Sequence, residues 1–505
     1  MSTFKKLAGQ TAIYGLSSIV GRSLNYLLVP IYTRVFEAGE YGVVTQLYAY
    51  IAFMTVLFTY GLDVAFFRYF QSEKGNPKVY STSLISIIFS SVLFAGLIIF
   101  FSENLSGIIG SSHEGLVGPD PDRPFYISLF AGILAFDAIT AVPFAKLRQE
   151  NRAKKFAFVR LSNIAINIIL NLFFLIVCPA ILKHNPSSWI TIFYKADFGV
   201  GYVFISNLIA SLLTFILLAP DIFKMEWKFD KALWKTMMIY SLPLMIAGLA
   251  GMINETFDRV LIPILIENKS EAMSQLGIYG ACYKLSILMT LFIQTFRYAA
   301  EPFFFSHSTK ENPQKTYADV MNYFVVVCAF IFLGIMLFMG IIQTFIGEKF
   351  RSGVGVVPIL LMANLCLGVF YNLSIWYKLT GKTKWGAWLA IFGAVITLIL
   401  NFALIPTMGY MGAAWTTLLC YAAMMILSYV VGQKFYPVPY NLKSFFYFIG
   451  LSLGLWLLGR FIDINLIPGK IMSIIINLLI LFAFIVLAVA YLRKKNNYLR
   501  PSNDN

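Results

Sequence analysis

Apolar runs of about 20 residues recur from one end of this chain to the other, and a run of that length spans a bilayer as an α-helix. Hydrophobic residues make up 59% of the 505 residues and charged residues only 12%, whereas soluble domains are about 25% charged. The longest polar connections, around 104–124 and 182–200, are too short for a soluble domain with its own core. The sequence therefore predicts an all-α polytopic membrane protein.

The apolar runs predict fourteen transmembrane helices. We expect them at about 9–33, 42–67, 79–102, 124–146, 156–180, 200–220, 236–265, 276–298, 317–343, 355–377, 385–406, 411–432, 444–462 and 470–492. On this topology 26 Lys and Arg residues fall on the side of the N-terminus and 9 on the other side. The positive-inside rule then places both termini in the cytoplasm. The net charge of +15 reflects this topology, and no nucleic-acid partner is expected.

The chain also repeats itself. "IYGLSSIVG" at residue 13 aligns with "IYSLPLMIA" at 239, and "EYGVV" at 40 aligns with "QLGIY" at 275. "PFAKLRQENRAKKFAF" at 143 resembles "IWYKLTGKTKWGAW" at 375. The shared order predicts two pseudo-symmetric six-helix lobes, 1–224 and 225–435, followed by two further helices and a cytoplasmic tail in 436–505. In such folds substrate sites lie between the repeats.

Ionisable side chains inside the predicted spans are the first candidates for a function, because a charge at the bilayer centre costs about 2.5–3.5 kcal/mol. Arg22, Asp137 and Lys284 lie too deep in their spans for their charges to reach an interface. Each of them either faces a wet cavity or belongs to a buried structural pair. Cations around a central cleft would suit an anionic substrate such as a phosphate or pyrophosphate, which arginine binds through forked hydrogen bonds.

A second group of charges lies in the outer half of the seventh span. Glu255 and Arg259 are four residues apart on one helix face, with Asp258 beside them. These three residues either form an interfacial ion pair that locks a helix end or line the mouth of a cavity between the lobes. Arg34 is the repeat counterpart of Arg259 and is expected at the outer rim.

Asp63 and Arg297 occupy equivalent positions in the two copies, where they either pair across the lobe interface or belong to solvated helix ends. We expect nearby carboxylates to release the substrate or to carry protons or sodium ions. The predicted substrate-binding residues are Arg22, Arg34, Arg259, Lys284 and Arg297. The predicted coupling or gating residues are Asp63, Asp137, Glu255 and Asp258.

Motifs for other chemistries are missing from the sequence. The three histidines lie in separate polar connections and form no metal-binding set, and no phosphate-binding GxxxxGK[ST] loop occurs. We therefore expect no enzyme activity, no metal and no cofactor, apart from a proton or sodium gradient that drives transport.

The opening "GQTAIYGLSSIVGRSLNYLLVPIYTRVFEAGEYGVVTQLYAY", with its R-x-F, short loop and E-Y-G, resembles the polysaccharide-biosynthesis exporters. These are the O-antigen (Wzx-type) flippases of the multidrug/oligosaccharidyl-lipid/polysaccharide exporter superfamily. The resemblance implies a flippase of the bacterial inner membrane. Such a protein turns undecaprenyl-pyrophosphate-linked oligosaccharide to the outer leaflet by alternating access. Membrane lipids and the polysaccharide polymerase machinery are the partners that it implies.

Two relatives within that superfamily give alternatives. The lipid II flippases of peptidoglycan synthesis carry an arginine in the first helix, where this chain has Arg22, followed by an Arg-Asp pair. Leu28 and Val29 stand in place of that pair, which disfavours lipid II as the substrate. The cation-coupled multidrug antiporters depend on membrane-embedded carboxylates, so the arginines of this chain disfavour that alternative too.

Overall fold

The computed structural model describes residues 20, 24, 26–73, 75–110, 123–308, 311–465 and 470–498, among which there are helices and no strand. Within this part of the chain, twelve helices are long and apolar enough to cross a membrane, and α12 with α13 forms a thirteenth, bent candidate. These thirteen coincide with the second to the fourteenth expected spans. The first expected span, 9–33, lies mostly outside the described residues. The all-α polytopic fold class is confirmed.

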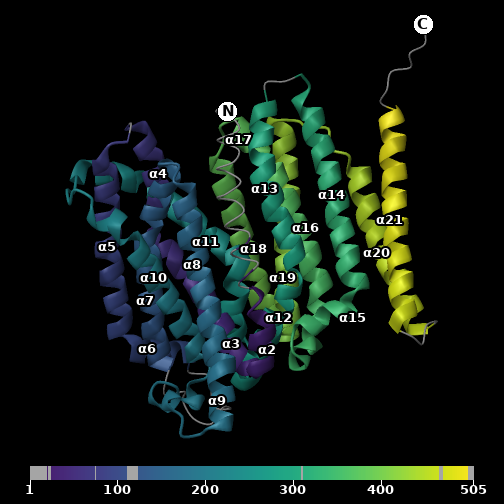
Figure 1. The fold of residues 1–505 in the computed structure, drawn as a ribbon. Helices are drawn as coiled ribbons and strands as arrows, with labels where there is room; N and C mark the ends of the chain where they lie inside the picture. The colour runs from purple at the N-terminus through teal and green to yellow at the C-terminus, as the bar shows by residue number, and fades with distance from the viewer. Residues whose placement is uncertain are drawn as a thin grey trace. The chain divides into compact units, whose positions relative to one another are not determined.

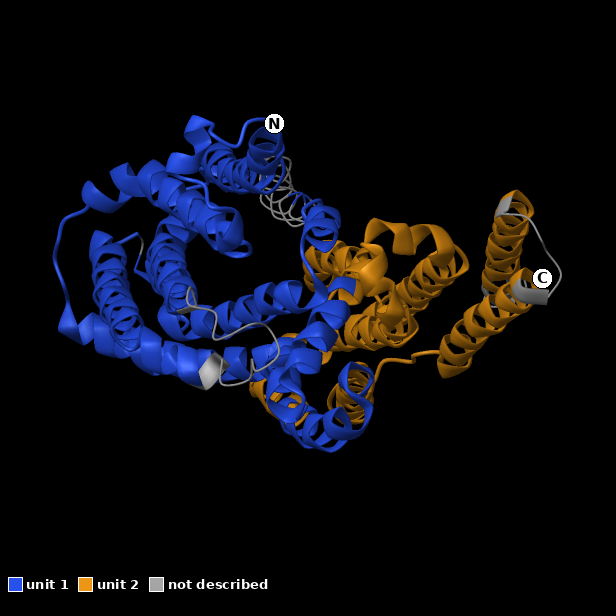
Figure 2. Ribbon diagram, turned by 90° about the horizontal axis from the view of Figure 1, so that it is seen from below, with its two compact units in different colours: residues 1–281, 394–413 blue, residues 282–393, 414–505 orange. Residues whose placement is uncertain are grey.

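The chain divides into two compact units, which Figure 2 shows in different colours. Unit 1 contains residues 1–281 and 394–413, and unit 2 contains residues 282–393 and 414–505. The division therefore does not fall at the expected lobe boundary of 224 and 225, because α11 and most of α12 pack within unit 1. The two lobes of the internal repeat stay a prediction.

The helices of unit 1 are α2 (Val29–Val35), α3 (Ala38–Thr59), α4 (Leu62–Ser72), α5 (Pro77–Phe100), α6 (Ser102–Gly110), α7 (Arg123–Gln149), α8 (Ala153–Leu172), α9 (Cys178–His184), α10 (Gly201–Phe223) and α11 (Lys231–Leu265). Helix α12 (Lys269–Leu285) begins in unit 1 and ends in unit 2. The helices of unit 2 are α13 (Ile287–His307), α14 (Pro313–Leu337), α15 (Met339–Ile342), α16 (Val357–Leu373), α17 (Ile375–Leu379), α20 (Leu442–Asn465) and α21 (Lys470–Tyr498). Helices α18 (Lys384–Met408) and α19 (Tyr410–Phe435) contribute to both units.

Helix α7 is central to unit 1, where it packs against α5 and α10 (Figure 1). Ile133, Leu134 and Val142 on α7 are almost completely buried. Helices α5 and α11, which neighbour the C-terminal end of α7, begin with clear capping residues. Pro77 occupies the first turn of α5 after the Asn76 cap, and the Asp230 side chain accepts a hydrogen bond from the backbone N–H of Leu233 in α11. These caps set the residues at which α5 and α11 begin, and both helices pack against α4.

The second expected span is two helices, because the chain bends between α3 and α4. Tyr60 and Gly61 both have left-handed backbone conformations, with φ angles of 34° and 71°. A Cβ atom on Gly61 would lie 3.0 Å from the carbonyl oxygen of Ser241 on α11. Glycine satisfies both demands at this bend, since it adopts positive φ without strain and leaves room for α11.

Two aligned glycines of the internal repeat contact each other inside unit 1. Gly42 on α3 is the counterpart of Gly277 on α12 in the "EYGVV" and "QLGIY" segments. A Cβ atom on Gly42 would collide with the carbonyl group of Met273, and one on Gly277 would collide with that of Ala38. The backbones of α3 and α12 therefore approach as closely as small residues at membrane helix interfaces allow.

In unit 2, helix α14 packs against α16, α20 and α21, so the last two helices form part of its packed structure (Figure 1). Phe324, Phe332 and Leu333 on α14 are almost fully buried. Trp456 on α20 lies edge-on to Phe332, with ring centroids 6.0 Å apart. Aromatic packing of this kind holds α20 against α14.

Candidate functional site

The structure places most of the predicted site residues, and it places them in both units. Arg22 lies outside the described residues. Lys284, in the last turn of α12, and Arg297, on α13, belong to unit 2. The predicted residues in unit 1 are Arg34, Asp63, Asp137, Glu255, Asp258 and Arg259. Their surroundings differ so much that each needs to be described by its own contacts.

Asp258 is a buried structural acceptor. The Tyr279 hydroxyl donates a hydrogen bond of 2.6 Å to its Oδ2, and the backbone N–H of Arg259 donates one of 2.8 Å to its Oδ1. Asp258 is only 4% exposed and Tyr279 is fully buried. The pair connects α11 to α12, so it favours the interpretation that this carboxylate locks a helix end.

The neighbours of Asp258 are less enclosed. Glu255 is exposed and Arg259 is half-buried. Arg34 is exposed at the end of α2, where its Nη1 donates a hydrogen bond of 2.8 Å to the carbonyl oxygen of Pro30. The predicted roles of Glu255, Arg259 and Arg34 stay predictions.

Asp137 belongs to a polar cluster within the membrane-spanning part of unit 1. The Ser211 hydroxyl on α10 donates a hydrogen bond of 2.7 Å to Asp137 Oδ1 on α7. Asn207, one turn before Ser211, donates a hydrogen bond of 3.2 Å to the Tyr48 hydroxyl on α3. Arg160 on α8 lies within electrostatic reach of the carboxylate. A carboxylate inside a span beside hydroxyl groups and a cation is typical of a proton or ion pathway.

A pocket with two arginines lies at the end of unit 1 where α4 is found. It has a volume of about 600 Å³ and lies between α4, α7 and α11. Its wall is formed by Asp63, Val64, Phe67, Arg68, Gln71, Ser72, Arg148 and Tyr240. We call it the basic pocket, because two arginines and a single carboxylate line it.

Aromatic rings position the two arginines of the basic pocket. The Arg68 guanidinium carbon lies 4.3 Å from the centre of the Tyr240 ring, and that of Arg148 lies 5.7 Å from the centre of the Phe67 ring. The Gln149 side chain donates a hydrogen bond of 2.8 Å to the carbonyl oxygen of Phe67, which ties α7 to α4. Both arginines are exposed. Forked donors of this kind match the oxygens of a phosphate group.

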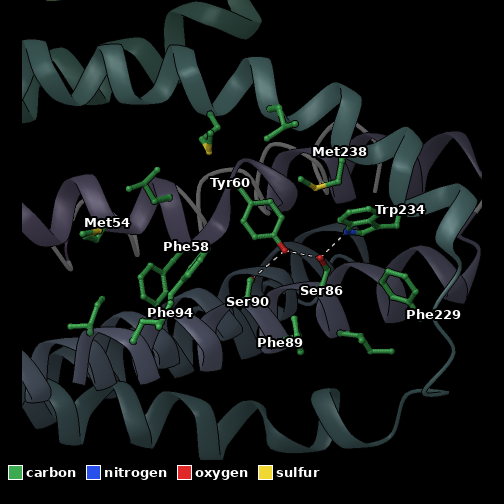
Figure 3. Close-up of a pocket in the computed structure, with 16 residues that line it drawn as sticks. Met54, Phe58, Tyr60, Ser86, Phe89, Ser90, Phe94, Phe229, Trp234 and Met238 are labelled. Carbon is green, nitrogen blue, oxygen red and sulfur yellow. Dashed lines mark hydrogen bonds between the residues drawn. The ribbon is translucent and has the colours of Figure 1, made fainter. Parts of the chain in front are cut away.

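An apolar groove lies between α3, α5 and α11 and is shown in Figure 3. Its volume is about 860 Å³, and methionine, leucine, isoleucine and phenylalanine side chains of α3, α5 and α11 form most of its wall. Tyr60 and Ser86 share a hydrogen bond of 2.8 Å, and Trp234 donates one of 2.8 Å to Ser86 (Figure 3). Ser90 lies 3.4 Å from the Tyr60 hydroxyl. The polar groups in the groove are thus hydrogen-bonded to one another, so a bound molecule would contact a surface that is mostly hydrocarbon.

The basic pocket and the apolar groove both lie in unit 1 near the α3–α4 bend, but no described residue lines both of them. Tyr60, the last residue before the α3–α4 bend, lines the groove, and Asp63 just after it lines the pocket. On α11, Met238 lines the groove and Tyr240 lines the pocket. Residues two apart lie on opposite faces of a helix, so unit 1 has a pocket that suits an anionic group on one face of α11 and a groove that suits a hydrocarbon chain on the other face. An amphiphile with a phosphate head group has both parts.

Arg297 lies in a smaller pocket of unit 2, at the position that the repeat aligns with Asp63. Its guanidinium carbon is 5.0 Å from the centre of the Tyr371 ring. Lys378 in the same pocket donates a hydrogen bond of 2.8 Å to Glu301. This pocket encloses only about 20 Å³. Each unit thus has a charged pocket of its own, and the one in unit 1 is much the larger.

Of the charged residues that line the basic pocket, the sequence pattern singled out Asp63 but neither Arg68 nor Arg148. Arg68 and Arg148 both follow predicted spans and count there as evidence for topology. One signal for such residues was available in the sequence. In both copies of the predicted repeat a span ends with a basic residue close to aromatic residues, as in "DVAFFRYF" and "IWYKL". Tyr279 gives no such signal, because its partner Asp258 lies on another helix.

The fold defines a polytopic helical membrane protein, and its unit 1 has an arginine-lined pocket and an apolar groove. The chain belongs to the polysaccharide biosynthesis protein family, because residues 7–308, more than half of its length, match the model of that family. The resemblance of the opening segment is therefore confirmed at the level of the family. No curated protein matches the sequence.

Solved structures of membrane transporters share the fold. A lipid II flippase MurJ in an inward closed conformation matches with a TM-score of 0.72 and 15% sequence identity, over 94% of this chain and 98% of that chain. A multidrug resistance MATE family transporter of the MOP superfamily, facing inward, matches with a TM-score of 0.62 and 14% identity. That match covers 82% of this chain and 94% of that chain. At these identities the likeness establishes the fold.

Proposed function

We propose that the protein is a flippase for undecaprenyl-pyrophosphate-linked oligosaccharide. It moves this lipid from the cytoplasmic to the outer leaflet of a bacterial inner membrane by alternating access, for the synthesis of a surface polysaccharide such as O-antigen. The family, which is one of polysaccharide biosynthesis proteins, and the fold, which is also that of a lipid II flippase, support this proposal. Both termini lie in the cytoplasm, and polymerase machinery receives the product.

The observation that carries the proposal is that unit 1 has both a basic pocket and an apolar groove, on the two faces of α11. A pyrophosphate needs several strong donors, which Arg68 and Arg148 supply. A polyprenyl chain packs favourably against an apolar surface, which α3, α5 and α11 supply. A small cationic drug would find two guanidinium groups repelling it at the same pocket. The site therefore favours an anionic lipid over the substrate of a multidrug antiporter.

A gradient drives the cycle, and the Asp137 cluster is the coupling element in unit 1. Asp137 lies within a span and accepts a hydrogen bond from Ser211 on another helix. Loss or gain of a proton at such a carboxylate changes the hydrogen bonding between α7 and α10. The protein needs no cofactor for this step beyond the proton or sodium gradient itself.

The test is transport in proteoliposomes containing the purified protein. Fluorescent undecaprenyl-pyrophosphate oligosaccharide, lipid II and a small organic cation are supplied separately, with and without a proton or sodium gradient. Arg68→Gln and Arg148→Gln each remove charge-assisted hydrogen bonds of about 1.5–3 kcal/mol, so each lowers oligosaccharide flipping by about tenfold or more. Both side chains are exposed, and their replacement leaves the core intact.

Lys228→Gln is the matched control, because Lys228 is an exposed cation of unit 1 that pairs with Glu226 outside the basic pocket. It keeps the flipping rate of the unmodified protein. Exclusive movement of lipid II, or gradient-driven efflux of the cation alone, would replace the proposed substrate by that of one of the two alternatives. Equal rates for the arginine variants and the control would remove the basic pocket from the substrate path.

A further inference from the structure

A cavity of about 510 Å³ lies in unit 2, at the end where α14 and α20 finish. Helix α20 contributes Trp456, Arg460 and Asp463 to its wall. The rest of the wall comes from the end of α14, from α15, from the 3₁₀ segment η5 (Glu348–Val356) and from the first turn of α16. The basic pocket and the apolar groove both lie in unit 1, so the proposed function leaves this cavity without a role.

Two opposite charges line the cavity without neutralising each other. Arg460 and Asp463 are three residues apart, so they lie on the same face of α20. Among the residues that the structure describes, neither forms a salt bridge. Asp463 Oδ2 lies 3.4 Å from the Asn477 amide, and its Oδ1 has no donor among the same residues. A cation and an anion are therefore both available to a molecule in the cavity.

The two charges lie at the depth of lipid headgroups. Between Lys443 and Arg460, α20 carries no charged side chain. At 1.5 Å per residue this stretch is roughly 25 Å long, which approaches the thickness of about 30 Å of the hydrocarbon core. Trp456, one turn before Arg460, is of a residue type that is enriched at the boundary between hydrocarbon and headgroups. Arg460 and Asp463 thus mark where α20 leaves the hydrocarbon.

The remaining wall is largely apolar and leaves room for a ligand. Met336 and Leu337 of α14 and Met339 of α15 line it. Gly340 lines it too, and a Cβ atom there would meet nothing within 4 Å. A volume of about 510 Å³ lies within the usual range of small-molecule sites. A wall with both signs of charge and an apolar part matches a zwitterionic headgroup attached to a hydrocarbon chain.

We propose that this cavity binds a membrane phospholipid with a phosphoethanolamine headgroup. The Arg460 guanidinium binds the phosphate through forked hydrogen bonds. The ammonium group donates hydrogen bonds to the Asp463 carboxylate, and the partial negative charge at the C-terminal end of α20 also favours an ammonium group there. Met336, Leu337 and Met339 contact the first carbons of the lipid chains. The lipid joins α20 to α14 and α16, whatever substrate the protein moves.

The experiment measures lipid binding to the full-length protein, purified and delipidated in detergent. Phosphatidylethanolamine, phosphatidylcholine and phosphatidylglycerol with identical acyl chains are added separately, and native mass spectrometry counts the bound lipids. Choline has no N–H to donate, and phosphatidylglycerol carries no ammonium group. We expect one saturable site for phosphatidylethanolamine. Its Kd should be about tenfold lower than that of either other lipid, because hydrogen bonds to a charged group are among the stronger ones.

Two variants separate the two halves of the headgroup. Asp463→Asn keeps the size of the side chain and is expected to abolish the preference for ethanolamine over choline. Arg460→Gln is expected to weaken the binding of both lipids about tenfold, because both carry the phosphate. Glu348→Gln and Lys443→Gln are the matched controls. Glu348 is an exposed carboxylate of η5 and Lys443 an exposed cation of α20, and both lie outside the cavity wall. Both controls are expected to bind like the unmodified protein.

Four results would overturn the proposal. Equal Kd values for the ethanolamine and choline lipids would indicate surrounding lipid only. A preference that survives Asp463→Asn, or an Arg460→Gln variant that binds like the controls, would move the headgroup away from these residues. Displacement of the lipid by an equal concentration of soluble glycerophosphoethanolamine would make the ligand a soluble molecule. None of these measurements uses flipping activity, so they leave the proposed function untouched.

Discussion

At the scale of single residues, the charges of this protein divide into those that hold helices together and those that face open space. Asp258 satisfies both of its carboxylate oxygens with Tyr279 and the α11 backbone. Asp63, Arg68 and Arg148 instead surround a cavity of about 600 Å³. A membrane position makes an ionisable residue costly in either case, so depth in the membrane does not by itself separate the two groups.

The Asp258–Tyr279 pair gives a prediction for stability. Tyr279→Phe removes the hydroxyl donor and leaves a buried carboxylate oxygen unsatisfied, which costs about 1–3 kcal/mol. The midpoint of thermal unfolding should fall by several degrees, measured on purified protein. Tyr298→Phe is the control, because Tyr298 is an exposed tyrosine and its replacement should change the midpoint little. Equal midpoints for the two variants would mean that the pair contributes nothing to stability.

Sequence reasoning located the charged residues but not their partners. It placed Glu255, Asp258 and Arg259 on one turn of a helix from spacing alone. Asp258 turned inward because Tyr279, which is 21 residues further on, reaches it from α12. Such a pairing depends on how two helices pack against each other, and the spacing of residues along a single helix carries no information about that packing. For the same reason Arg68 and Arg148 indicated only topology until α4, α7 and α11 were seen to enclose one pocket.

At the scale of elements, the length of an apolar run predicts where a membrane span lies, but it does not predict where a span is divided into two helices. All thirteen candidates in the described part of the chain fall where a long apolar run is found. The bends after Thr59 and after Leu285 leave no trace in those runs, because α3 and α4, like α12 and α13, are apolar on both sides of the break. At the first bend the physical cause is the left-handed pair Tyr60 and Gly61.

The α3–α4 bend gives a second prediction. Gly61→Ala forces a Cβ atom into a left-handed conformation, which costs about 1–2 kcal/mol, and also brings it close to the Ser241 carbonyl. The unfolding midpoint should fall. Gly96→Ala is the matched control, since Gly96 lies inside helix α5 with nothing within 4 Å of a new Cβ. Alanine should leave that helix as stable or slightly more stable. If Gly61→Ala lowered the unfolding midpoint no more than Gly96→Ala does, the positive φ at residue 61 would carry no strain.

At the scale of the whole molecule, the charge bias of the loops makes a prediction about orientation. The five cysteines are all buried, so an introduced surface cysteine is the one that reacts with a membrane-impermeant maleimide. Glu226 and Ser187 are exposed residues of unit 1 in connections that are expected on opposite sides of the membrane. In intact spheroplasts Ser187→Cys should react, and Glu226→Cys should react only after permeabilisation.

The reverse labelling pattern would place both termini outside the cytoplasm and would invert the direction of every proposed step. Reaction of both variants in intact spheroplasts would instead indicate leakage. The unmodified protein is the control for the native thiols, because any labelling of it would come from its five buried cysteines.

The glycine contact between α3 and α12 has a meaning for the history of the chain. Gly42 and Gly277 are counterparts in the repeat, and each faces the backbone of the other's helix. A residue that meets its own counterpart is the hallmark of an isologous interface, in which one patch serves both partners. Before the predicted duplication, a single six-helix ancestor would have made this contact with a second copy of itself. One ancestral glycine would then have served both sides of a symmetric dimer contact.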